Sequence, residues 1–163
     1  MTWNAEKMRE LGARHATLEA KRDLEGVMAT LVEDPVYEFL PVGLGMRGGS
    51  RVRRYYENLF STFIPATRDY RLVDEWVNER SLAQEYEIEL EFSGRREMHR
   101  VVGILYASGE LLDGERVYAS ERCIRLMTGG LYDELTPTGH SPPRLRTSIR
   151  SPTATSPGST TRT

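Results

Sequence analysis

Two histidines and several tyrosines are the residues whose side chains could move a proton at neutral pH. Proton transfer next to a carbonyl group needs a side chain whose pKa lies near the working pH, and a donor that stabilises the developing enolate. His15 and His99 carry the imidazole that meets the first need. A tyrosine hydroxyl in apolar surroundings meets the second need, and the candidates are Tyr37, Tyr56 and Tyr118. Each of these residues has an alternative role as an ordinary part of the core.

The segment 116–127 is predicted to be the last strand, and the direction of its side chains decides which of them could act. Alternation places Tyr118 and Ser120 on one face and Val117 and Glu121 on the other. With the apolar Val117 inward, Glu121 is a partly buried acid with a raised pKa, which suits a general base. The sequence leaves both directions open.

Apolar residues at helical spacing predict two helices at the start of the chain. In the first, Met8, Leu11 and His15 share one face, so His15 is predicted to point inward. Asp23 is the predicted N-cap of the second helix, which we expect to stop at Pro35 because the residue before a proline avoids the helical region. The inward residues of this second helix are Leu24, Val27, Met28 and Leu31.

A third helix follows a short strand and a turn. Residues 36–41 are predicted to form the strand, and the glycine-rich segment 43–49 a turn, since it lacks the ending of a phosphate-binding loop. Ser50 is the predicted N-cap of the third helix, and Pro65 its end. The apolar stripe of this helix is Val52, Tyr56, Leu59 and Phe63.

Alternating residues predict antiparallel strands over 70–79, 82–92 and 95–106. The alternation over 82–92 places Tyr86 and Ile88 on the buried face and a row of glutamates on the solvent-exposed face. A two-residue loop at Ser93-Gly94 sets Glu91 opposite Arg96 and Glu87 opposite Arg100. The same register brings His99 and Val101 to the face of Ile88 and Tyr86.

Length and composition predict one domain. The chain has 163 residues, of which 39% are hydrophobic, and a net charge of −2. We expect a cytoplasmic protein, because no apolar run could span a bilayer and the first residues do not resemble a signal peptide. The single cysteine, Cys123, and the three histidines predict neither a disulfide nor a metal site.

The last 28 residues differ from the rest of the chain. They contain four arginines and no acid, so the preceding part has 18 basic against 24 acidic residues, which argues against binding nucleic acid. Their Ser, Thr, Pro and Arg content predicts a disordered tail over 136–163, with an arm that touches an anionic partner as the alternative. The folded domain is therefore predicted over residues 1–135.

Three segments resemble the SnoaL-like branch of the nuclear transport factor 2-like (NTF2-like) superfamily. They are residues 15–35 (HATLEAKRDLEGVMATLVEDP), 49–60 (GSRVRRYYENLF) and 114–129 (GERVYASERCIRLMTG), and the resemblance covers residues 8–131. Helix, short helix, strand, long helix and a run of antiparallel strands occur in the order typical of this fold.

The resemblance implies an α+β, cone-shaped fold in which three N-terminal helices pack on a strongly curved mixed or antiparallel sheet. It also implies a pocket at the wide end and a homodimer that packs through the sheets. Such proteins include polyketide cyclases, ketosteroid isomerases, epoxide hydrolases, dehydratases and noncatalytic binders, so the fold does not decide the activity. The cyclases use an acidic residue on the last strand, where this chain has Ser120.

Taken together, these patterns predict binding of a small, largely apolar, carbonyl-bearing ligand, which the protein isomerises, cyclises or dehydrates by cofactor-free acid–base chemistry. The alternative is a noncatalytic ligand-binding or dimerisation module; an epoxide hydrolase would need an Asp-Arg-Asp set that the strands lack. Membrane and nucleic-acid partners are not expected. The predicted catalytic residues are His99, Tyr118 and Glu121, and the predicted ligand-binding residues are His15, Tyr37, Tyr56, Tyr86, Ile88, Val101 and Ser120.

Overall fold

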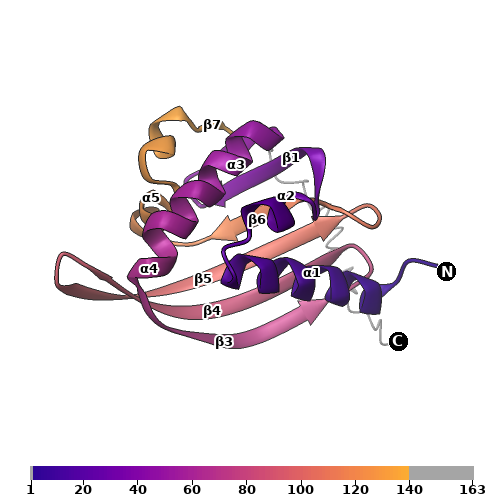
Figure 1. The fold of residues 1–163 in the computed structure, drawn as a ribbon, viewed down its shortest axis with the longest axis horizontal. Coiled ribbons are helices and arrows are strands. Elements are labelled where there is room, and N and C mark those ends of the chain that lie inside the picture. Colours follow the sequence, from indigo (N-terminus) through magenta and orange to yellow (C-terminus); the bar gives the residue numbers. More distant parts are fainter. Residues whose placement is uncertain (1, 140–163) are drawn as a thin grey trace, which may run out of the picture.

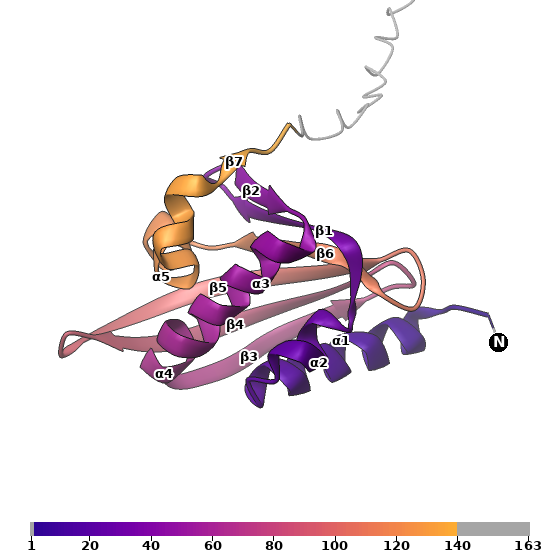
Figure 2. The ribbon, with the colours of Figure 1, turned by 45° about the horizontal axis from the view of Figure 1, so that its top comes forward.

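The structure is a computed structural model that describes residues 2–139. Within this part of the chain, seven strands form one curved sheet in the order β3-β4-β5-β6-β1-β2-β7, and helices cover one of its faces (Figures 1 and 2). β1 and β6 are parallel, whereas the other neighbours are antiparallel, so the predicted α+β fold with a mixed sheet is confirmed. The strands are β1 (Leu31–Leu40), β2 (Leu44–Arg47), β3 (Thr67–Val77), β4 (Ser81–Phe92), β5 (Arg95–Ala107), β6 (Leu112–Tyr118) and β7 (Thr136–Pro137).

Helices α1 (Ala5–Ala20) and α2 (Leu24–Met28) begin the chain, as predicted. His15 lies on the buried face of α1, because Met8, Leu11 and His15 recur at helical spacing. Asp23 caps α2 by accepting a hydrogen bond from the backbone N–H of Gly26 at 2.9 Å. α2 ends at Met28, however, and residues 31–35 belong to β1 rather than to the helix.

The third helix starts and ends differently from the prediction. It begins at Gly49 as α3 (Gly49–Asn58), and the residue before it is Gly48 at φ 100°, so Ser50 is not its cap. It continues through a π-helical turn, η1 (Leu59–Phe63), into α4 (Ile64–Ala66), which tolerates Pro65 in its first turn. The predicted turn over 43–49 contains β2, which forms a hairpin with β1.

The β4–β5 hairpin has the predicted register. Glu91 lies opposite Arg96, and Ile88 lies opposite His99. Ser93 and Gly94 both have positive φ, which matches the twist that a two-residue hairpin loop needs. Side chains alternate between the faces, so His99 is on the inner face, toward the helices, as predicted.

The predicted last strand is wrong beyond Tyr118. β6 ends there, and residues 121–128 form helix α5 (Glu121–Thr128), followed by the 3-10 helix η2 (Gly129–Glu134). Ser120 is the N-cap of α5, since its hydroxyl accepts a hydrogen bond from the backbone N–H of Cys123 at 3.2 Å. The capping serine and the helical spacing of Cys123 and Met127 outweigh the apparent alternation.

The C-terminal boundary of the domain also differs slightly from the prediction. Thr136 and Pro137 form β7 and pair with Gly45 and Leu44 of β2, so the folded part extends past residue 135. Residues 140–163 lie outside the described residues, and their predicted disorder stays a prediction. None of the described helices has the length and apolar character needed to cross a membrane. The cytoplasmic location stays a prediction.

Candidate functional site

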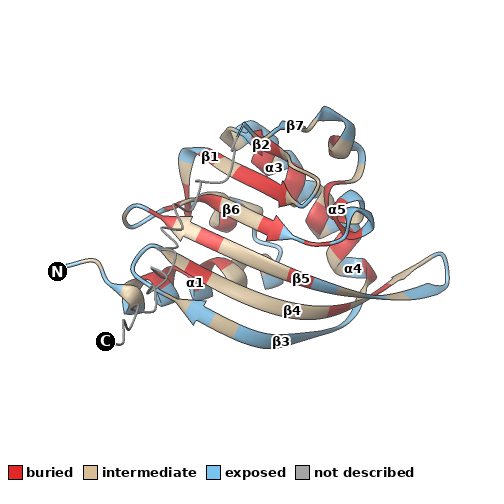
Figure 3. Ribbon diagram, turned by 180° about the vertical axis from the view of Figure 1, so that it is seen from behind, coloured by how far each residue is buried: buried red, intermediate tan, exposed pale blue. Residues whose placement is uncertain are grey.

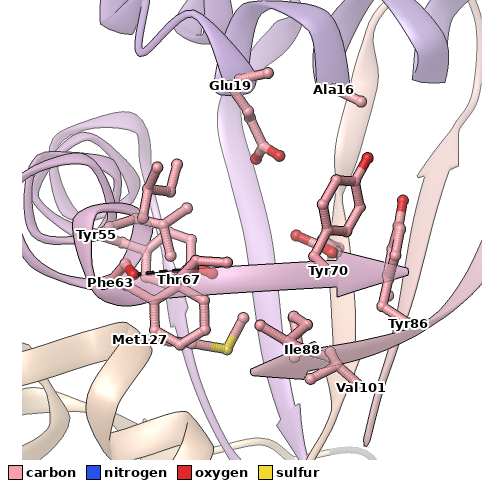
Figure 4. A pocket seen from close by; sticks show the side chains of 16 residues that line it. Ala16, Glu19, Tyr55, Phe63, Thr67, Tyr70, Tyr86, Ile88, Val101 and Met127 are labelled. Atoms are coloured by element: carbon pink, nitrogen blue, oxygen red, sulfur yellow. Dashed lines mark hydrogen bonds between the residues drawn. The ribbon is translucent and has the colours of Figure 1, made fainter. Parts of the chain in front are cut away.

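A cavity of about 360 Å³ lies between the inner face of the sheet and the helices (Figure 4). Helix α1 forms one wall, the continuous helix from α3 to α4 forms another, and strands β3 to β6 form the floor. Most of the wall is apolar or aromatic, so the cavity suits a ligand with an apolar body. The lining residues are Ala16, Glu19, Ala20, Tyr55, Leu59, Phe63, Ile64, Thr67, Tyr70, Tyr86, Ile88, Val101, Gly103, Glu115, Val117 and Met127.

Two glutamates, which we name the carboxyl pair, are the ionisable acids of this wall: Glu19 from α1 and Glu115 from β6. Figure 4 shows the Glu19 carboxylate reaching from the helix toward the space between Tyr55 and Tyr70. Burial and, to a smaller extent, the nearby negative charge of Glu19 raise the pKa of Glu115 to about 8. The Glu115 carboxyl therefore holds a proton at neutral pH.

The Glu115 carboxyl borders the cavity and is only half-buried by surface area, yet protein atoms surround it closely enough to disfavour its charged form. Among the described residues, no group donates a hydrogen bond to it. Gly103 makes room for it, because a Cβ atom at that position would lie 2.7 Å from Glu115 Oε1. A side chain on this part of β5 would displace the carboxyl.

A chain of buried hydrogen bonds lies behind the cavity. The Thr30 hydroxyl donates to the carbonyl oxygen of Val27 at 2.6 Å, so it accepts from His15 Nδ1, also at 2.6 Å. His15 Nε2 lies 2.9 Å from the Tyr56 hydroxyl, which lies 2.7 Å from the Tyr37 hydroxyl. A neutral imidazole satisfies this pattern completely: Tyr37 donates to Tyr56, and Tyr56 donates to His15 Nε2.

This chain of hydrogen bonds also reaches the carboxyl pair. Glu19 Oε1 lies 3.4 Å from His15 Nε2, one helical turn along α1. His15, Tyr37 and Tyr56, predicted as ligand-binding residues, are at most 1% exposed and lie outside the cavity lining. They support the wall rather than form it.

The structure places the remaining predicted ligand-binding residues in two groups. Tyr86, Ile88 and Val101 line the cavity, and their role in binding stays a prediction. Ser120 does not line it, because its hydroxyl caps α5 and its side chain is at the surface. The Tyr86 hydroxyl donates to Gln84 Oε1, so its proton is already engaged.

The predicted catalytic residues do not come together. The His99 side chain is 8% exposed and points to the inner face, but it lies outside the cavity lining, with Nε2 3.4 Å from Glu97 Oε2. Tyr118 is 43% exposed on the outer face of β6. Glu121 is exposed on α5, and its hydrogen bond with Arg125 lowers its pKa, so the expected raised pKa is wrong.

Sequence reasoning missed both members of the carboxyl pair, although signals for them were present. Glu115 has the same parity on β6 as Val117, so the apolar-inward alternative for this strand also turns Glu115 inward. Glu19 follows the inward His15 by four residues on the same helix. No cluster of three or more metal-binding side chains occurs among residues 2–139.

The molecule has the NTF2-like fold, as the superposition with solved structures shows. No family model matches the sequence, and no curated protein matches it. The structure is similar to a putative ketosteroid isomerase from Kribbella flavida DSM 17836, with TM-score 0.59 and 18% identity over 72% of this chain and 80% of that one. The finer assignment to the SnoaL-like branch stays a prediction.

Two further structures are similar. An NTF2-like protein of unknown function from Cytophaga hutchinsonii ATCC 33406 has TM-score 0.58 and 12% identity over 69% of this chain and 98% of that one. An LEH-like epoxide hydrolase from M. tuberculosis has TM-score 0.58 and 16% identity over 80% of this chain and 96% of that one. At these identities the likeness concerns the fold.

Proposed function

We propose that the protein binds a small, largely apolar, carbonyl-bearing ligand in this cavity and acts on it by cofactor-free acid–base chemistry. The carboxyl pair takes the roles that the sequence assigned to His99, Tyr118 and Glu121. One observation carries the proposal: a carboxyl group that holds its proton at neutral pH faces an apolar cavity large enough for a small molecule.

The chemistry follows from the raised pKa of Glu115, which keeps a proton to donate beside the negative charge of Glu19. Glu115 donates a proton to the carbonyl oxygen of the ligand, while the Glu19 carboxylate accepts a proton from the adjacent carbon, so the product is an enol. Return of a proton to another carbon gives an isomer. Tyr70 offers a second donor, since its hydroxyl has no hydrogen-bond partner among the described residues.

Exchange of hydrogen for deuterium next to the carbonyl group tests this proposal. Binding and exchange of a panel of small cyclic and aromatic ketones are measured by NMR for the native protein, E19Q and E115Q. We expect exchange that both substitutions reduce at least tenfold while affinity changes less. E10Q, an exposed position on the same helix, is the matched control and keeps the native rate. Exchange that survives in both variants contradicts the proposed roles.

A noncatalytic binding module is the second candidate, and the hydrogen bond of the Tyr86 hydroxyl favours it. Its hydroxyl donates to Gln84, so it is not free to stabilise an oxyanion. Ketones that bind without any exchange would support this candidate. The epoxide hydrolase alternative lacks support, because the described cavity lining contains neither Asp nor Arg.

We also propose that two copies pair through the outer face of the sheet. Figure 3 views the molecule from this side, where the strands lie in front of the helices. Met98 is 65% exposed on β5, and Tyr118 is exposed on β6; both side chains alternate away from the cavity. Exposed apolar side chains among charged neighbours are typical of protein–protein contacts.

A further inference from the structure

The cavity has an unbalanced charge. Its described lining contains the carboxyl pair and no Arg, Lys or His. Several other acids of the described residues pair with arginines: the buried Glu38 pairs with Arg116 at 2.8 Å, and Glu97 pairs with Arg122 at 2.7 Å. The carboxyl pair, in contrast, faces the cavity without a positive partner from the lining.

His15 is the cationic candidate nearest to this pair, and its hydrogen bonds are satisfied without a charge. Its Nδ1 donates to Thr30, and its Nε2 accepts from Tyr56. The imidazole lies beside Glu19 but outside the cavity lining.

Aromatic rings surround the same space. Tyr55, Phe63, Tyr70 and Tyr86 all line the cavity, and Tyr70 and Tyr86 lie with ring centroids 5.6 Å apart (Figure 4). The face of an aromatic ring attracts a cation, and the attraction is strongest where water is excluded. Carboxyl groups and ring faces around one hollow are complementary to an organic ammonium group.

We propose that the natural ligand carries a protonated amine that binds between Glu19 and Glu115 against the tyrosine rings, with its apolar body along Ile88 and Val101. This inference rests on the proposed function, because it assumes that the cavity binds a small molecule. It adds a basic nitrogen to the expected ligand.

The proposal predicts opposite pH trends for cationic and neutral ligands. A bound ammonium favours ionised Glu115, so binding releases a proton and affinity rises as the pH approaches about 8. A neutral ketone accepts a hydrogen bond from protonated Glu115, so its affinity falls over the same range. The tyrosines that face Glu115 from α3, β1 and β4 stay neutral, because burial raises their pKa values; they are Tyr55, Tyr56, Tyr37 and Tyr86.

Three probes with one skeleton test this: 1-(2-naphthyl)ethylamine, 1-(2-naphthyl)ethanol and 2-acetylnaphthalene. Their affinities are measured by calorimetry at pH 6 and pH 8.5, in two buffers that report proton release. We expect the amine to bind at least tenfold more tightly than the alcohol at pH 8.5, with a smaller advantage at pH 6. E19Q should reduce the advantage at both pH values, and E115Q should remove its pH dependence, whereas E10Q should change neither.

The outcomes separate this inference from the function on which it rests. Binding of the ketone and alcohol with no advantage for the amine overturns the inference and leaves the proposed function intact. An amine advantage that persists in E19Q and E115Q also overturns it, because the attraction then comes from elsewhere. Binding of none of the probes by a protein with native circular dichroism contradicts the inference and the proposed function together.

Discussion

Glu115 is the residue on which the account of the cavity depends, and its ionisation should be visible in stability. Its pKa is about 8 in the folded protein, above the ordinary value of 4.5 that the unfolded chain has. Between these values the unfolded chain releases a proton that the folded protein keeps, so the free energy of unfolding falls as pH rises from 4.5 to 8. The loss is complete above pH 8.

E115Q should remove this loss, because glutamine resembles the protonated acid and cannot ionise. We expect the variant and the native protein to melt at similar temperatures at pH 5, and the variant to melt several degrees higher at pH 9. Thermal melting monitored by circular dichroism across this range is the measurement. A constant difference between the two proteins at every pH would contradict the raised pKa.

Helical and strand periodicity predicted the inward direction of His15 and His99 and the positions of Tyr86, Ile88 and Val101. It did not find Glu115, because the alternation of residues on β6 does not show which set of side chains points toward the core. The raised pKa of that residue depends on its burial and on Glu19 of α1, which is distant in sequence. Desolvation of a carboxyl is a property of the packed molecule.

At the scale of elements, the buried hydroxyl chain joins helix α1, the long helix and strand β1. Y56F removes the central hydroxyl and leaves His15 Nε2 and the Tyr37 hydroxyl without their partner. We expect a loss of about 1–3 kcal/mol in the free energy of unfolding. Urea denaturation measures it, with Y132F as the control, because the Tyr132 hydroxyl makes its hydrogen bond at the surface. Equal effects of the two substitutions would contradict the structural role of the buried hydroxyl chain.

The N-cap of α5 gives a second test at this scale. S120A removes the acceptor for the backbone N–H of Cys123 and should cost about 1 kcal/mol in the free energy of unfolding. S120D retains a capping oxygen and should restore most of the loss. Urea denaturation of both variants checks this, and equal stability of S120A and the native protein would be inconsistent with the cap.

The same serine explains why the last predicted strand was wrong. Alternating residues favour a strand over 116–127, but Ser120 followed by Glu121 and Arg125 is also a helix start with an i,i+4 ion pair. Ile124 and Met127 then bury one face of the helix against the core. Local patterns fit both structures, and the packing of α5 against the long helix decides between them.

At the scale of the whole molecule, the outer sheet face predicts self-association. We expect light scattering to give the mass of two chains for the native protein, and the mass of one chain for the double variant M98E and Y118E. L111E is the control, because Leu111 is exposed in the turn between β5 and β6 rather than on the outer face. A native protein that scatters as a single chain would contradict the pairing.

The order of elements and the α+β class could be predicted because helices and strands differ in their apolar period. β2 and β7 could not, since two to four residues carry too little periodic signal. The cavity depends on the curvature of β3 to β5 around α1 and α3 (Figure 2). That curvature is set by long-range packing, which no short pattern contains.

The most direct test of the account is the titration of the Glu115 side chain by carbon-13 NMR, with E115Q used to assign its carboxyl signal. We expect the signal to move with a midpoint near pH 8, as burial beside Glu19 predicts. A midpoint near the ordinary value of 4.5 would mean that the carboxyl is ionised and hydrated at neutral pH. The proposed proton donor in the cavity would then not exist.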